Sequence, residues 1–137
     1  MNASPARSPR GFTLVEIIIV LGIIGILLGL GLPQYKNSLI KARESVLREN
    51  LFQLRKLLDQ YHLDKGKYPD SLQALVQDNY IRMIPVDPIT KSSTTWVEVR
   101  ETPAPDEYVT PESLGVIDVK SGSEEKSPID QTPYNSW

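Results

Sequence analysis

One carboxylate stands alone in the most apolar part of the chain. Residues 12–32 carry a single charged side chain, Glu16, and residues 17–32 are all Ile, Val, Leu or Gly. A carboxylate within a membrane helix costs a few kcal/mol, and ionisable groups in such positions are usually paired or functional. If the chain were cut between Gly11 and Phe12, the new Phe12 amine of a neighbouring copy would be a natural partner. We therefore expect a Glu16–amine pair that aligns one copy with the next, with snorkelling of Glu16 to the membrane surface as the alternative.

Residue types that commonly carry catalysis or bind metals are scarce. The 137 residues include no cysteine and one histidine, His62, which we expect to contact a helix dipole or lie exposed. A disulfide framework, a thiolate zinc site and a cysteine nucleophile are excluded, and a His-dependent triad is unsupported. The formal net charge of −2 argues against a basic nucleic-acid-binding protein, and the sequence has no phosphate-binding glycine loop. We expect a protein that is not an enzyme and binds no nucleic acid.

The apolar run is itself an element that could cross a membrane. As a helix, residues 12–32 would be about 30 Å long, which matches the hydrocarbon core of a bilayer. Arg7 and Arg10 precede the run, so its start should stay in the cytoplasm. Gly25-x-x-x-Gly29 is a close-packing pattern of membrane helices. A secretory signal and a buried core helix are the competing interpretations of the run, but no small-residue cleavage site follows it and its glycines are costly in a soluble helix. A plain anchor is the alternative to packing through these glycines.

A second, amphipathic stretch follows from Gln34 to Asp64 without Pro or Gly. Its apolar positions recur at helical spacing, and the residues are Ile40, Leu47, Leu51, Leu54, Leu58 and Tyr61. We expect this stripe to pack on the chain's own sheet, with a coiled-coil partner as the alternative. Gly66 is a suitable C-terminal cap. Joined across Pro33, the helix would reach about Lys65, and the proline should bend it or melt it locally.

The remaining residues predict a small α+β head. Asp70 is expected to cap a short helix that ends near Asp78, with Gln73 three positions after the cap. Thr94–Arg100 and Gly115–Lys120 have the apolar content of strands, and residues 108–109 could add a third. The predicted fold is therefore a long N-terminal helix, half transmembrane and half amphipathic, packed on a small antiparallel sheet.

At its start, the chain resembles a known family. Gly11-Phe12-Thr13-Leu14-Val15-Glu16 and the apolar run resemble the signal of type IV pilins and type II secretion pseudopilins. The resemblance implies that prepilin peptidase cuts after Gly11 and N-methylates Phe12. It also implies that local melting at Pro33 accompanies filament assembly. The expected regions are a cleaved leader, a transmembrane and assembly helix, an amphipathic helix and a globular head, at residues 1–11, 12–33, 34–65 and 66–137.

Within that superfamily, the head resembles the G-type major pseudopilin. The matching pieces come in the same order along the chain: Gly66-Lys67-Tyr68-Pro69, Tyr80-Ile81, Ile84-Pro85-Val86-Asp87-Pro88 and the terminal Asn135-Ser136-Trp137. Two places depart from the pattern. Ile89-Thr90-Lys91 replaces the usual Trp-Gly turn, and the tail loop is shorter, with Glu124-Glu125 where the family usually has an Asp.

The same resemblance implies a calcium ion in the tail loop. The matching oxygen donors would be the Ser121 carbonyl, Glu124, Ser127 and Asp130. Clustered oxygen ligands are those that calcium prefers. The alternative is a solvated acidic tail without a metal.

The resemblance implies a structural subunit of a type II secretion pseudopilus in the bacterial inner membrane. The subunit would cross the membrane once, with its N-terminus cytoplasmic and its head periplasmic. Its expected partners are further copies of itself, other pseudopilins, prepilin peptidase, and an inner-membrane assembly platform with its ATPase. One alternative is a type IV pilin of a surface fibre for adhesion, motility or DNA uptake. Another is a membrane-tethered enzyme or binding domain that forms no polymer.

Overall fold

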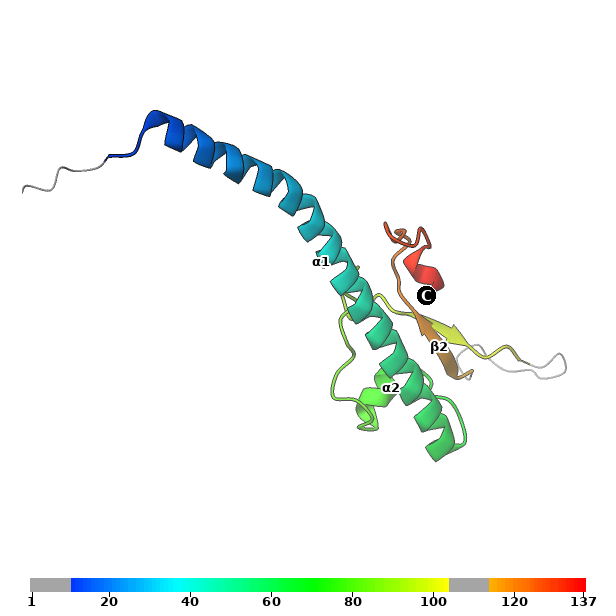
Figure 1. Ribbon diagram of the computed structural model, residues 1–137. Coiled ribbons are helices and arrows are strands. Elements are labelled where there is room, and N and C mark those ends of the chain that lie inside the picture. The colour runs from blue at the N-terminus through cyan, green and yellow to red at the C-terminus, as the bar shows by residue number, and fades with distance from the viewer. Residues whose placement is uncertain (1–10, 104–113) are drawn as a thin grey trace, which may run out of the picture. The chain divides into compact units, whose positions relative to one another are not determined.

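A computed structural model describes residues 11–103 and 114–137 of the chain (Figure 1). The contacts divide the chain into two compact units, residues 1–39 and 40–137. Helix α1, Leu14–Lys65, has 52 residues and belongs in part to each unit. The second unit also contains α2 (Leu72–Gln77), β1 (Val97–Arg100), β2 (Val116–Lys120) and the 3₁₀ helix η2 (Tyr134–Ser136). The predicted α+β class, a long helix with a small antiparallel sheet, is confirmed.

The first unit contains the apolar part of α1. The Thr13 hydroxyl caps the start of α1 by accepting a hydrogen bond from the Glu16 N–H at 3.2 Å. By length and composition, α1 contains a segment that could cross a membrane, and none of that segment is buried. Pro33 lies inside a helix that is continuous from Leu14 to Lys65, so the local melting expected there is absent from this structure.

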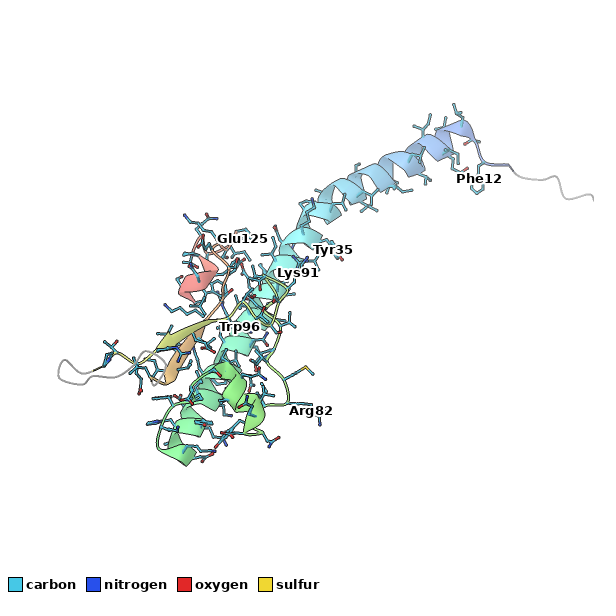
Figure 2. The ribbon with its side chains drawn as sticks, turned by 180° about the vertical axis from the view of Figure 1, so that it is seen from behind. Phe12, Tyr35, Arg82, Lys91, Trp96 and Glu125 are labelled. Atoms are coloured by element: carbon cyan, nitrogen blue, oxygen red, sulfur yellow. The ribbon has the colours of Figure 1, made fainter. Side chains whose placement is uncertain are left out.

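The core of the second unit forms on the predicted stripe of α1. Leu47, Leu51, Leu54 and Leu58 are at most 2% exposed, and burying each stabilises the fold by roughly 1.5–3 kcal/mol. The residues that pack with them come from the short helices, the sheet and its approach, and they are Leu72, Leu75, Trp96, Val116, Val119 and Tyr134. Trp96 lies within this core (Figure 2), and its indole N–H donates to the Pro85 carbonyl at 2.8 Å.

The sheet has two antiparallel strands among the described residues. Val97 pairs with Lys120 and Val99 with Asp118, and the register is irregular between Val99 and Arg100. β1 begins three residues later than predicted. The predicted start lies in irregular chain instead, after a turn at residues 88–91 that is closed by an isolated bridge between Asp87 and Ser92. The third strand considered at residues 108–109 lies outside the described residues.

The predicted cap of α2 is wrong. Ser71, rather than Asp70, occupies the N-cap position, and its side chain makes no capping hydrogen bond. A residue distant in sequence replaces the local cap, because Glu98 of β1 accepts from the Leu72 N–H at 2.8 Å. The other carboxylate oxygen of Glu98 accepts from Arg100 at 3.0 Å. The Gly66 cap of α1 is confirmed by its φ of 72° and by its N–H, which donates to the His62 carbonyl.

Candidate functional site

The predicted processing site lies at the start of α1. Gly11, Phe12 and Thr13 precede the helix and are exposed, so the Gly11–Phe12 peptide bond is outside regular structure. A Cβ on Gly11 would meet no described atom within 4 Å, so the packing of the described residues does not require glycine there. Glu16 lies in the first turn of α1, where the helix dipole favours negative charge. A protease can reach this bond without unfolding a helix.

The side chains that follow form an unpartnered apolar surface. Every large apolar residue from Phe12 to Leu32 is at least 45% exposed, and Phe12 is 80% exposed. Figure 2 shows Phe12 at the N-terminal end of α1. Such a surface is not stable in water and requires lipid or other apolar helices around it.

A second polar cluster joins α1 to the tail segment, which we define as residues 121–137. The Glu44 side chain is 5% exposed, and its Oε1 accepts hydrogen bonds from the Ser127 hydroxyl at 2.7 Å and the Tyr134 hydroxyl at 2.9 Å. Burial, followed by the hydrogen bond to Glu44, raises the pKa of Tyr134 to about 12. Both hydroxyls therefore act as donors to one buried carboxylate.

Arg48 lies one turn further along α1 and contacts the same tail segment. Its guanidinium donates to Asp130 Oδ2 at 2.7 Å, and its Cζ lies 4.3 Å from the centroid of the Trp137 ring. The Trp137 indole N–H donates to the Thr132 hydroxyl at 2.8 Å. A cation–π contact and an ion pair therefore hold Arg48 between two parts of the tail.

The residues predicted to bind calcium lie in this region, but as they lie the side chains of Glu124, Ser127 and Asp130 do not fit a calcium site. The Ser127 hydroxyl donates to Glu44 and accepts from the N–H groups of Ile129 and Asp130 at 3.1 and 3.0 Å. A hydroxyl has one donor and two acceptor positions, so all three are used. Asp130 is paired with Arg48, and the Glu124 side chain is exposed. In the part of the chain described, no three His, Asp or Glu side chains form a metal-binding group. Calcium binding stays a prediction.

Glu44 was not identified as a functional residue from the sequence, although a signal was present. The apolar stripe runs through residues 40, 47, 51, 54, 58 and 61, and Glu44 occupies the one position of that repeat that is not apolar. An acidic residue at a core position must find hydrogen-bond donors, because an unpaired buried charge is costly. The break in the stripe therefore indicates a buried polar contact, although it does not say with which residues.

His62 lies in the last turn of α1, where the expected contact with the helix dipole is available. Its ring stacks on that of Tyr68, with centroids 4.1 Å apart and an interplanar angle of 10°. Its Nδ1 is buried and has no hydrogen-bond partner among the described atoms. The stack joins the last turn of α1 to the segment that follows Gly66.

The exposed Gly11–Phe12 bond, the apolar helix that carries Glu16 and the small α+β head define the class of pilin-like subunits. Residues 6–32 match the family model described as a prokaryotic N-terminal methylation motif. Over 147 residues, the chain is 31% identical to the type II secretion system core protein G of Klebsiella michiganensis, covering 96% of this chain and 94% of that protein. It is 30% identical to the protein of the same name from Vibrio cholerae, covering 82% and 79%. The chain belongs to the type II secretion system core protein G family, and is a pseudopilin.

A relative from Pseudomonas aeruginosa with the same name is 35% identical over a shorter stretch, covering 60% of this chain and 69% of that protein. No solved structure matches the chain.

Proposed function

We propose that this chain is a structural subunit of a type II secretion pseudopilus and polymerises from the inner membrane to drive protein export. The observation that carries the proposal is the helix that starts beside the accessible Gly11–Phe12 bond. That helix presents large apolar side chains that are all at least 45% exposed from Phe12 to Leu32. A segment of this kind can be held by lipid before assembly and by equivalent helices of other subunits afterwards. The resemblance of the relatives over most of both chains supports the same conclusion.

Glu16 would direct assembly after processing. Cleavage after Gly11 creates an α-amino group on Phe12, and prepilin peptidase would then methylate it. The Glu16 carboxylate is costly in lipid while it is unpaired, and pairing with the amine of a neighbouring subunit offsets that cost. The electrostatic gain is available in one register only. Subunits would therefore add to the growing fibre at a fixed axial step.

The proposed topology places the N-terminus in the cytoplasm and the head in the periplasm, because Arg7 and Arg10 precede the apolar helix. The sequence has no phosphate-binding loop, so the energy for growth would come from the ATPase of an inner-membrane assembly platform. Other pseudopilins would complete the fibre. Its work on the exported protein would be mechanical.

A deletion strain tests the proposal when secreted proteins and surface fibres are examined in the same cultures. We expect exported proteins to accumulate in the periplasm while surface fibres persist, and expression of the wild-type chain should restore export. Intact export with lost surface fibres would instead indicate a type IV pilin. If the processed, membrane-inserted chain stayed monomeric, the result would contradict both the pseudopilin and the pilin interpretation and would indicate a membrane-tethered domain that forms no polymer.

A further inference from the structure

The tail segment is held against α1 by direct contacts between side chains. Glu44 and Arg48 are one helical turn apart, so both project toward the same side of α1. Glu44 binds the hydroxyls of Ser127 and Tyr134, and Arg48 binds the carboxylate of Asp130. We call this set of two α1 residues and three tail residues the latch.

The hydrogen bonds of the Ser127 hydroxyl leave that oxygen no free lone pair for a cation. Two backbone N–H groups occupy the acceptor positions of its hydroxyl, and its proton points to Glu44. A calcium ion bound through this oxygen would have to displace at least one of these partners. If the ion displaced the hydrogen bond that the Ser127 hydroxyl donates to Glu44, the buried Glu44 carboxylate would lose one of its two donors and keep Tyr134.

The charge of Asp130 is already balanced. Arg48 is a permanent cation 2.7 Å from the Asp130 carboxylate, and the face of Trp137 helps to hold it there. A calcium ion at Asp130 would lie next to this guanidinium and be repelled by it. Glu124, the other acidic donor of the predicted set, is exposed and takes no part in the latch.

We propose that Glu44 and Arg48 hold the tail segment on α1 without a metal ion, and so replace the calcium ion that the family resemblance implies. The latch gives the tail one buried anchor at Ser127 and Tyr134 and one surface anchor at Asp130. The fold of the head is then independent of the calcium concentration around it. This inference concerns the fold of the head and does not depend on which export system the fibre serves.

Thermal unfolding of the complete processed chain in detergent micelles tests the proposal. Trp96 and Trp137 report the transition by fluorescence, and Trp137 lies in the tail itself. We expect the same Tm in EGTA and in about 5 mM calcium, which exceeds the ~10⁻³ M dissociation constants of weak extracellular calcium modules. Terbium should show no emission sensitised by the tryptophans. A Tm that rises by several degrees with calcium, or saturable terbium emission, would overturn the proposal.

Variants separate the latch from a metal site. Ser127→Ala and Glu44→Ala should lower Tm by several degrees, equally with EGTA and with calcium, and Glu44→Gln should recover part of the loss because its amide oxygen still accepts. Glu49→Ala is the matched control, since Glu49 is exposed on the same helix and, among the described residues, its side chain accepts a hydrogen bond from Gln53 alone. Glu124→Gln should leave Tm unchanged in both solutions.

If Glu124→Gln had a lower Tm than the wild type in calcium but not in EGTA, this result would contradict the latch and support a metal site. If a latch variant gives no unfolding transition, the Tm values of the wild-type chain and of Glu124→Gln still decide between the latch and a calcium site. The wild-type comparison needs no substitution, and the exposed Glu124 side chain makes no hydrogen bond or ion pair with the described residues.

Discussion

Arg55 of α1 and Asp118 of β2 form an ion pair with an Nε–Oδ1 distance of 2.6 Å. The same guanidinium donates to the main-chain oxygens of Val119 at 3.0 Å and Trp137 at 2.9 Å. One side chain therefore connects the long helix, the second strand and the tail. Because the pair is more than a third exposed, its charge attraction alone stabilises the fold only slightly.

Substituting Arg55 should cost more than an ordinary surface ion pair. Arg55→Met keeps most of the aliphatic stem but removes three hydrogen bonds, so we expect a loss of about 1–2 kcal/mol in the free energy of unfolding. Urea unfolding followed by tryptophan fluorescence measures it. Lys56→Met, at the neighbouring exposed position, is the control and should change stability by less than about 0.5 kcal/mol. Equal effects of the two substitutions would mean that Arg55 does not connect these elements.

Gly122 should tolerate no side chain. A Cβ at this position would overlap the carbonyl oxygen of Thr95, which belongs to the backbone and cannot rotate away. Gly122→Ala should therefore destabilise the head by about 1–3 kcal/mol. Gly31→Ala is the control, because a Cβ at Gly31 meets nothing within 4 Å. Urea unfolding of both variants checks this, and an unchanged midpoint for Gly122→Ala would contradict the close approach.

Tyr134 should make the head sensitive to alkali. Its pKa is raised from 10.0 to about 12 in the folded chain, so the folded state holds the phenol proton more tightly than the unfolded state. This contribution to stability is fully present below pH 10 and is lost as the pH rises through about 12. Unfolding free energies across that window should fall more steeply for the wild type than for Tyr134→Phe. Some slope should remain in the variant, because the pKa values of Tyr61 and Tyr80 are also raised.

Glu16 should be needed for assembly and dispensable for processing. Glu16→Ala leaves the Gly11–Phe12 bond unchanged, so we expect the mature mass in the membrane fraction but no fibres by electron microscopy. Glu49→Ala, which removes an exposed carboxylate from the head part of α1, is the control and should assemble. Normal fibres from Glu16→Ala would remove the pairing role.

Gly11 should matter to the peptidase and not to the fold. Because a Cβ at Gly11 meets no atom within 4 Å, Gly11→Leu should leave the Tm of the head unchanged. We expect this variant to accumulate as the uncut precursor, which mass spectrometry distinguishes by the retained leader. Cleavage at the wild-type rate would argue against this processing site.

The helical core could be predicted from the sequence because its signal is local. Leu47 through Tyr61 repeat at helical spacing, and all the predicted positions in that range are buried. The cap of α2 could not be predicted in this way, because Glu98 supplies it from 26 residues further along the chain. The late start of β1 has a local cause, because a turn at residues 88–91, closed by a bridge between Asp87 and Ser92, is followed by irregular chain up to Val97.

The parts of the candidate site that depend on contacts between residues far apart in sequence were harder to predict than the contiguous motif. Gly11, Phe12 and Glu16 follow one another in sequence, so their motif is visible without a structure. Glu44 and Tyr134 are far apart in sequence, and no periodicity connects them. The tail residues Ser127 and Asp130 were assigned to a metal by resemblance, whereas the structure gives both of them partners on α1.

The latch also determines when the head can finish folding. Its bonds join residues 82 to 90 positions apart, and contacts of such separation form late because a long loop must close first. With the proposed topology, residues 40–65 reach the periplasm well before residues 127–137. The leucines of α1 then lack Tyr134 as a partner until translocation is nearly complete. Only a fully exported chain would become a folded head, so truncated or stalled chains would be kept out of the fibre by the order of their own folding.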